Sequence, residues 1–226
     1  GWHATGNFSA GSYGYLNPSA TLSYGRSAFS ILGGYSYRLS SPYTDGSGRK
    51  FTEGLNYRPE TFDSDAFRVG TVWGSVAASP FAGHLARFSY SHQEADHVLY
   101  PYLQMDAVYD DTDRINAGYQ IEDLKGFLRS LRVQGYYAQV DHWMTDEYRT
   151  SSLDKLRQYS MGTVAGTQVL GGKVETMLRS VKVGVEAYHR EWDGTTSMAG
   201  SNYAPQYSIP DVRTDNVGLY TEYTRP

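Results

Sequence analysis

The chain has 226 residues and no cysteine, which excludes disulfide scaffolds, zinc ribbons and thiol catalysis. Its 20 basic and 24 acidic residues give a net charge of −4, which argues against a general nucleic-acid-binding protein. The mean hydropathy is −0.52 and no apolar run approaches the ~18 residues of a transmembrane helix, but a membrane β-barrel stays possible because its apolar residues occupy only every second position.

The two ends of the chain are the first features in chain order. The opening residues Gly1 to Phe8 contain neither a charged n-region nor an apolar h-region. The chain stops at Pro226, directly after an alternating run and where a turn is expected. We therefore expect a mature or excised piece of a protein.

Alternation of apolar and polar residues with a period of two recurs along the chain and predicts strands. In 181–188, for example, Val181, Val183 and Val185 alternate with Lys182 and Glu186. About ten such runs can be counted. Their expected ranges are 2–12, 18–25, 28–39, 64–78, 84–94, 112–121, 128–144, 163–178, 181–193 and 212–224.

The connectors between these runs alternate in length. Those at 25–27, 79–83, 122–127 and 179–180 are short, whereas 40–63, 95–111, 145–162 and 194–211 are long and polar. Tight turns at one end and long loops at the other are typical of outer-membrane barrels. The sequence thus predicts an all-β fold, an antiparallel transmembrane β-barrel. A secreted β-sandwich is the alternative.

The two faces of the predicted strands agree with this fold. One face is apolar, and the other carries single charges in mid-strand, as the wall of a hydrated lumen would. These charges are Arg68, Lys173, Lys182, Glu186 and Glu222. Aromatic residues near the long connectors predict an interfacial girdle, made of Tyr35, Tyr37, Tyr90, Tyr137, Trp143 and Trp192.

Three segments carry a resemblance to a known family. The run 98–106, the strand entry 167–174 of the form T-x-x-x-G-G-K, and the stretch 136–148 resemble the barrel of TonB-dependent outer-membrane receptors. The last stretch, with Val140-Asp141-His142-Trp143-Met144, is most similar to the copper-receptor branch of that family. The resemblance covers most of residues 2–224.

This resemblance implies a function and a location. Family members close about 22 strands around an N-terminal plug, so residues 1–226 would be a barrel segment without the plug domain. The protein would take up a scarce solute, with copper as the first candidate, across the bacterial outer membrane. Its partners would be the lipid bilayer and, through the plug, the TonB energy-transducing complex. No enzymatic activity and no resident cofactor are implied.

In that branch a His-x-Met pair of the barrel holds copper together with ligands from the plug, and the matching residues here are His142 and Met144. Strand alternation supports a lumenal position for His142 and Met144, because residues i and i+2 of a strand share a face. Both residues are then on the same face as Arg132, towards the lumen. Imidazole and thioether suit copper, particularly Cu(I). The alternative reading is two rim residues of an external loop.

Other candidate ligand residues have weaker support from the sequence. Met105, Met144, Met161 and Met198 fall at the predicted outer ends and could line a copper approach, although long connectors hold many residues by chance. His92 and His97 are candidate accessory ligands or solvated loop histidines. The tracts 45–48 and 110–113 read as solvated acidic loops rather than calcium sites.

The sequence is also compatible with two other functions. A ferric siderophore or cobalamin is the second choice of cargo, because Tyr136, Tyr188 and Arg190 would suit such a ligand. A self-contained ten-stranded barrel, acting as an enzyme or pore, would pair its first strand with its last. Within Asp141-His142, however, neighbouring residues point to opposite faces, which disfavours a catalytic pair.

Overall fold

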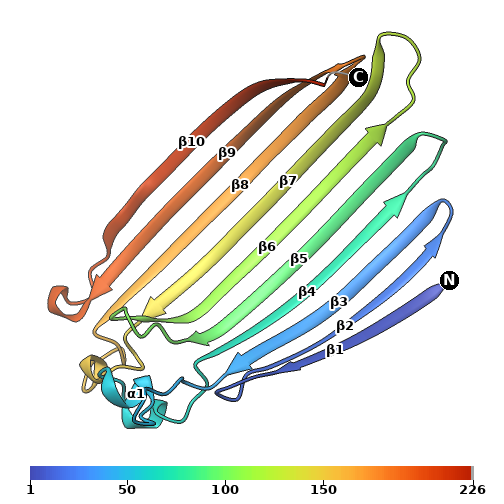
Figure 1. The fold of residues 1–226 in the computed structure, drawn as a ribbon. Coiled ribbons are helices and arrows are strands. Elements are labelled where there is room, and N and C mark those ends of the chain that lie inside the picture. The colour runs from blue at the N-terminus through green and yellow to red at the C-terminus, as the bar shows by residue number, and fades with distance from the viewer. Residues whose placement is uncertain (225–226) are drawn as a thin grey trace.

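The computed structural model describes residues 1–224, and Arg225 and Pro226, the expected cut end, lie outside them. Ten strands form one antiparallel sheet in chain order (Figure 1). No helix in this part of the chain is both long and apolar enough to cross a membrane. The strands are β1 (Trp2–Ala10), β2 (Leu16–Arg26), β3 (Phe29–Ser40), β4 (Phe67–Ala78), β5 (His84–Val98), β6 (Asp106–Ile121), β7 (Leu128–Thr145), β8 (Met161–Leu178), β9 (Val181–Met198) and β10 (Gln206–Tyr223).

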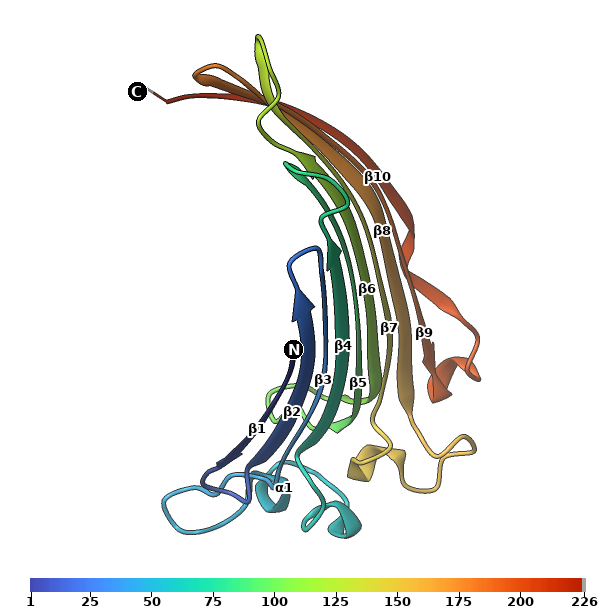
Figure 2. The ribbon, with the colours of Figure 1, turned by 90° about the vertical axis from the view of Figure 1, so that its right-hand side faces the viewer.

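The sheet is a curved wall with two open edges (Figure 2). Each strand pairs with its neighbour in the chain, while β1 and β10 stand at opposite ends of the strand order. The hypothesis of a barrel closed at ten strands is therefore wrong for residues 1–224. The sandwich alternative is wrong as well, because the described strands belong to one sheet rather than two packed sheets.

The expected strands are all present, but several continue further than predicted. β5 runs to Val98, β6 begins at Asp106, β9 runs to Met198 and β10 begins at Gln206. These extensions are rich in Asp, Ser and Thr and therefore resemble loops in composition. Their backbones nevertheless find ladder partners on the neighbouring strands, and the edge strand β10 finds them on β9 alone, so ladder pairing rather than apolar character extends the strands.

The longer connectors gather at one end of the wall, at the lower left of Figure 1. They contain the short helix α1 (Phe51–Gly54) and 3₁₀ turns at Pro59–Thr61, Thr150–Ser152 and Ala199–Ser201. Phe51, Tyr57, Ala66 and Leu99 form a small buried core beneath them. The loops at this end are consequently packed structures.

A buried ion pair joins two of these loops to the first residue of β6. The Arg149 guanidinium donates to both carboxylate oxygens of Asp106, over 2.6 and 2.7 Å, and the two residues are 5% and 0% exposed. The Tyr57 hydroxyl donates to Asp106 over 3.0 Å, and the Arg149 guanidinium carbon lies 3.7 Å from the centroid of the Tyr57 ring. Burial, followed by the Asp106 charge, raises the pKa of Tyr57, so this hydroxyl stays protonated.

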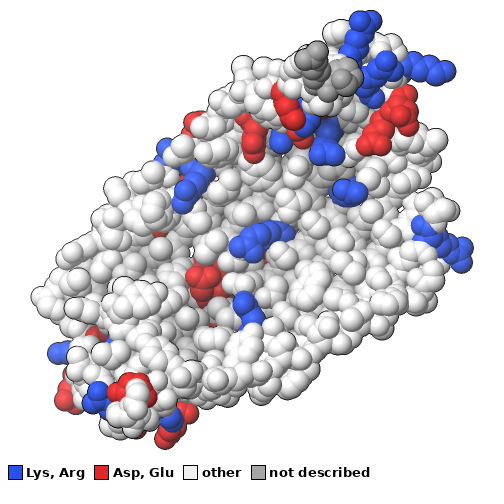
Figure 3. Space-filling model, viewed as in Figure 1, with Lys and Arg blue, Asp and Glu red and all other residues white. Residues whose placement is uncertain are grey.

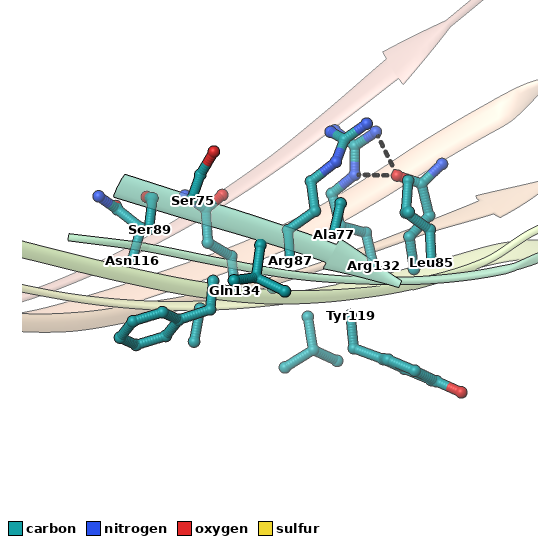
Figure 4. A pocket seen from close by; sticks show the side chains of 15 residues that line it. Ser75, Ala77, Leu85, Arg87, Ser89, Asn116, Tyr119, Arg132 and Gln134 are labelled. Atoms are coloured by element: carbon teal, nitrogen blue, oxygen red, sulfur yellow. Dashed lines mark hydrogen bonds between the residues drawn. The ribbon is translucent and has the colours of Figure 1, made fainter. Parts of the chain in front are cut away.

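The two faces of the wall differ as strand alternation predicts. The concave face, which is turned to the viewer in Figure 3, carries scattered charges that gather towards the short-turn end. Near that end, Figure 4 shows Arg87, Asn116 and Arg132 on one side of the sheet and Tyr119 on the other. The register places Leu131, Val133 and Tyr137 of β7 on the convex face, with Val174 and Leu170 of β8 beside them.

Two assignments of individual residues to a face were wrong. Arg68 pairs in register with Leu39 and Asp96 on the convex face, where its guanidinium lies 2.9 Å from the Asp96 carboxylate. Trp192 pairs with Thr167 on the concave face, so it is not part of the external aromatic girdle. The other four predicted lumenal charges do lie on the concave face, as their cross-strand partners show.

Candidate metal and solute site on the concave face

His142 and Met144 lie at the end of β7 that leads into the long connector to β8, which we call the outer end. Both are on the concave face with Arg132 and Tyr136. Both side chains are half-buried rather than fully solvated. The strand ends one residue later, at Thr145, and continues into the loop that carries Arg149. The predicted strand phase of the pair therefore agrees with the structure, whereas metal binding by the pair stays a prediction.

A carboxylate that sequence reasoning missed orients His142. Asp110 of β6 is its direct register partner, and the Asp110 Oδ2 atom lies 2.7 Å from His142 Nδ1. A carboxylate on one ring nitrogen fixes the tautomer and leaves Nε2 as the ligand atom, as in many metal sites. Asp110 is 32 residues away in the sequence, so only strand pairing reveals it.

We expect the Asp110→Ala substitution to weaken copper binding at His142 by about 10- to 100-fold, because outer-shell carboxylates contribute that much to ligand orientation and basicity. Titration of the intact protein with Cu(I) against a competing chelator measures the change. Asp111→Ala is the matched control, since Asp111 pairs with Asp141 on the opposite face. Equal losses in the two variants would contradict the assignment.

Two further methionines lie near this pair. Met144 pairs in register with Thr163 of β8. Two residues from Thr163, towards the long connectors, Met161 of β8 pairs with Met198 of β9. Alternation along the two strands places them on the concave side of the rim. Among residues 1–224, no cluster of three or more His, Cys, Asp or Glu side chains is placed to hold a metal ion.

The two other candidate histidines do not join the site. His92 lies on the convex face, where its Nδ1 is 3.0 Å from Asp113. The prediction of solvated loop residues was wrong for both histidines, since both lie within β5, and His97 packs its ring on that of Tyr148 at 4.4 Å. His97 also contacts the Ser64 hydroxyl, but that hydroxyl donates to the Thr61 carbonyl, so the arrangement is structural rather than nucleophilic.

The two acidic tracts have structural roles. The tract 110–113 is part of β6 and not a loop, and alternation sends Asp110 to the concave face and Asp111 and Asp113 to the convex face. In the tract 45–48, the Ser47 hydroxyl and two backbone N–H groups donate to the Asp45 carboxylate. These hydrogen bonds lower the pKa of Asp45 to about 2 and close a turn.

Inward of His142, the concave face is hollowed over β6 to β9. Arg114, Tyr136, Tyr188 and Arg190 surround a space of about 390 Å³ whose floor is Ala138 and Val169. A second space of about 350 Å³ lies nearer the short turns and is lined by residues of both faces of the sheet, with Arg132 donating to Gln120 at its edge (Figure 4). A path down the concave face thus passes the His142–Met144 pair before reaching the hollow.

The single antiparallel sheet, with a polar concave face and an apolar convex face, defines the class as a segment of β-barrel wall. Among solved structures the chain is similar to the copper transporter OprC, with a TM-score of 0.77 and 18% sequence identity. The match covers 98% of this chain and 34% of that one, so the chain spans about a third of its length. No protein-family model and no curated protein matches the sequence. A likeness at this level of identity shows the shared fold.

Proposed function

We propose that this chain forms part of the wall of a bacterial outer-membrane β-barrel that takes up copper. The observation that carries the proposal is the concave rim, where Asp110 orients His142 and Met144 follows on the same face. The fold it shares with the copper transporter OprC supports the proposal. The apolar convex face would contact lipid, and the concave face would line the water-filled lumen.

The proposal also covers the remaining copper ligands and the energy source for transport. Two side chains make half a copper site, so further ligands would come from a plug domain inside the barrel. The plug would couple to the TonB complex and rearrange as the solute passes inward. The barrel wall would bind and guide the solute without covalent chemistry.

Copper titration of the intact protein tests the metal site. We expect the His142→Ala and Met144→Leu substitutions each to weaken Cu(I) binding at least tenfold, since each removes a soft ligand from a small set. The same variants should slow copper uptake into cells in proportion.

The His189→Ala variant provides a matched control. His189 lies on the convex face, and its Nδ1 is 2.7 Å from Asp215, the same contact that His142 makes with Asp110. Copper binding should be unchanged in this variant. Copper affinity that is insensitive to His142→Ala and Met144→Leu would contradict the proposal.

A metal complex of an organic ligand, such as a ferric siderophore or cobalamin, is the second candidate cargo. The observation in its favour is the hollow lined by Tyr136, Tyr188 and Arg190, which offers aromatic and cationic contacts. Uptake assays with metal complexes, in parallel with copper, distinguish the two candidates.

A further inference from the structure

We infer that the hollow over β6 to β9 is a binding site for an elongated organic anion. The inference rests on the proposed function in one respect, because a transported solute reaches the hollow only if the concave face lines a lumen. It concerns a subsite separate from the His142–Met144 pair.

Two arginines define the ends of the hollow. Arg114, Ala138, Val169 and Arg190 are aligned in one register row across β6, β7, β8 and β9. Three inter-strand spacings separate the Cα atoms of the two arginines by about 14 Å. The two small side chains between them leave room for a ligand to lie across the strands with one guanidinium at each end.

Neither arginine is neutralised by a carboxylate of the described chain. Arg190 makes only a long contact, 3.4 Å, with the Thr167 hydroxyl and lies over the Trp192 ring at 5.1 Å, and Arg114 has no ion-pair partner within residues 1–224. Both side chains are exposed to the concave face. Guanidinium groups that are accessible and unpaired are suited to bidentate binding of carboxylate or phosphate.

The carboxylates further inward are already engaged. Glu175 accepts the Tyr220 hydroxyl over 2.6 Å and lies 3.3 Å from Lys173, and Glu222 lies 2.7 Å from Lys182. Glu186 accepts the Tyr136 hydroxyl over 2.8 Å. Glu175 and Glu222 are therefore paired with lysines, whereas Glu186 keeps its charge beside Tyr136 at the inward edge of the hollow. The two arginines outnumber this single carboxylate, so the hollow keeps a net positive charge.

The residues between the two arginines favour a ligand whose middle part is apolar or aromatic. Asn116, Tyr136, Gly171 and Tyr188 form the register row on the inward side of the floor. The Tyr136 ring lies over Gly171, where a Cβ atom would collide with it. The ring thus extends across β8 to Glu186, which accepts its hydroxyl, and together with Val169 it offers an apolar surface on which a conjugated ligand can stack.

Calorimetric titration of the intact protein in metal-free, low-salt buffer tests the inference, with 2,6-naphthalenedicarboxylate as the probe. We expect it to bind at least tenfold more tightly than the neutral 2,6-bis(hydroxymethyl)naphthalene, which has the same length. Arg114→Gln and Arg190→Gln should each weaken dianion binding about tenfold or more, since each removes a charge-assisted hydrogen-bonding group. The double variant should lose the preference for the dianion.

Arg213→Gln is the matched control, because Arg213 lies on the convex face with Glu191 at 3.3 Å, and this variant should bind as the parent does. Absence of dianion binding, equal binding of the neutral probe, or an equal effect of Arg213→Gln would overturn the inference. Copper titration of the same preparations separates the two proposals. Retained copper binding without dianion binding refutes the anion site alone, and the reverse result refutes the copper site alone.

Discussion

The Asp106→Ala substitution is expected to lower the free energy of unfolding by about 3–5 kcal/mol, because it leaves the Arg149 guanidinium buried without its counter-charge. Asp106 is fully buried and also accepts from the Tyr100 backbone N–H over 2.7 Å and from the Tyr57 hydroxyl. The loss should be concentrated in the loops 41–66, 99–105 and 146–160. Urea titration of the intact protein in lipid vesicles measures the total, and hydrogen exchange localises it.

Asp63→Ala is the control for this prediction. Asp63 forms an ion pair with Lys50 in the same group of loops, but its side chain is 91% exposed. Exposed pairs contribute about 0–1 kcal/mol, so the unfolding curve should barely move. Similar losses for Asp63→Ala and Asp106→Ala would show that the buried pair does not organise the loops.

The Gly34→Ala substitution is expected to destabilise the wall by about 1–3 kcal/mol through overpacking. A Cβ atom at Gly34 would lie 2.6 Å from Cε2 of the Trp73 indole and 2.9 Å from the Ala20 carbonyl oxygen. The carbonyl belongs to the neighbouring strand and cannot rotate away. Trp73 would have to leave its position, and the near-ultraviolet circular dichroism of the folded protein should change with it.

The adjacent glycine supplies the matched control. A Cβ atom at Gly33 would meet only the Trp73 carbonyl oxygen, at an ordinary 3.7 Å. Because glycine costs ~0.5–1 kcal/mol relative to alanine in a strand, Gly33→Ala should be neutral or slightly stabilising. If both variants unfold at the same urea concentration, close packing of Trp73 on Gly34 does not limit the stability of the wall.

The strand content and the face of most residues could be predicted from the sequence. Alternation of apolar and polar residues placed His142 and Met144 on the face of Arg132, and the structure agrees. Trp192 follows the same rule, because alternation from Tyr188 gives it the concave face. The expectation of a lipid-facing girdle residue followed its aromatic character and not its phase.

Strand ends and cross-strand partners could not be predicted in the same way. Residues 106–111 are polar enough to resemble a loop, yet Ala107 and the residues 109–111 pair with both β5 and β7. Arg68 was assigned to the wrong face because the phase of β4 is ambiguous in a run that contains Gly70, Trp73 and Gly74. Its pairing with Asp96 settles the phase.

The sequence by itself determined an all-β, antiparallel wall with one polar and one apolar face, because a strand's side chains alternate whatever surrounds it. Only the tertiary structure decided that the wall stays open at β1 and β10, that Asp110 orients His142, and that Arg114 and Arg190 flank Ala138 and Val169 in one register row. These features depend on the register between strands. Register is a relation between segments far apart in the chain, which local periodicity does not encode.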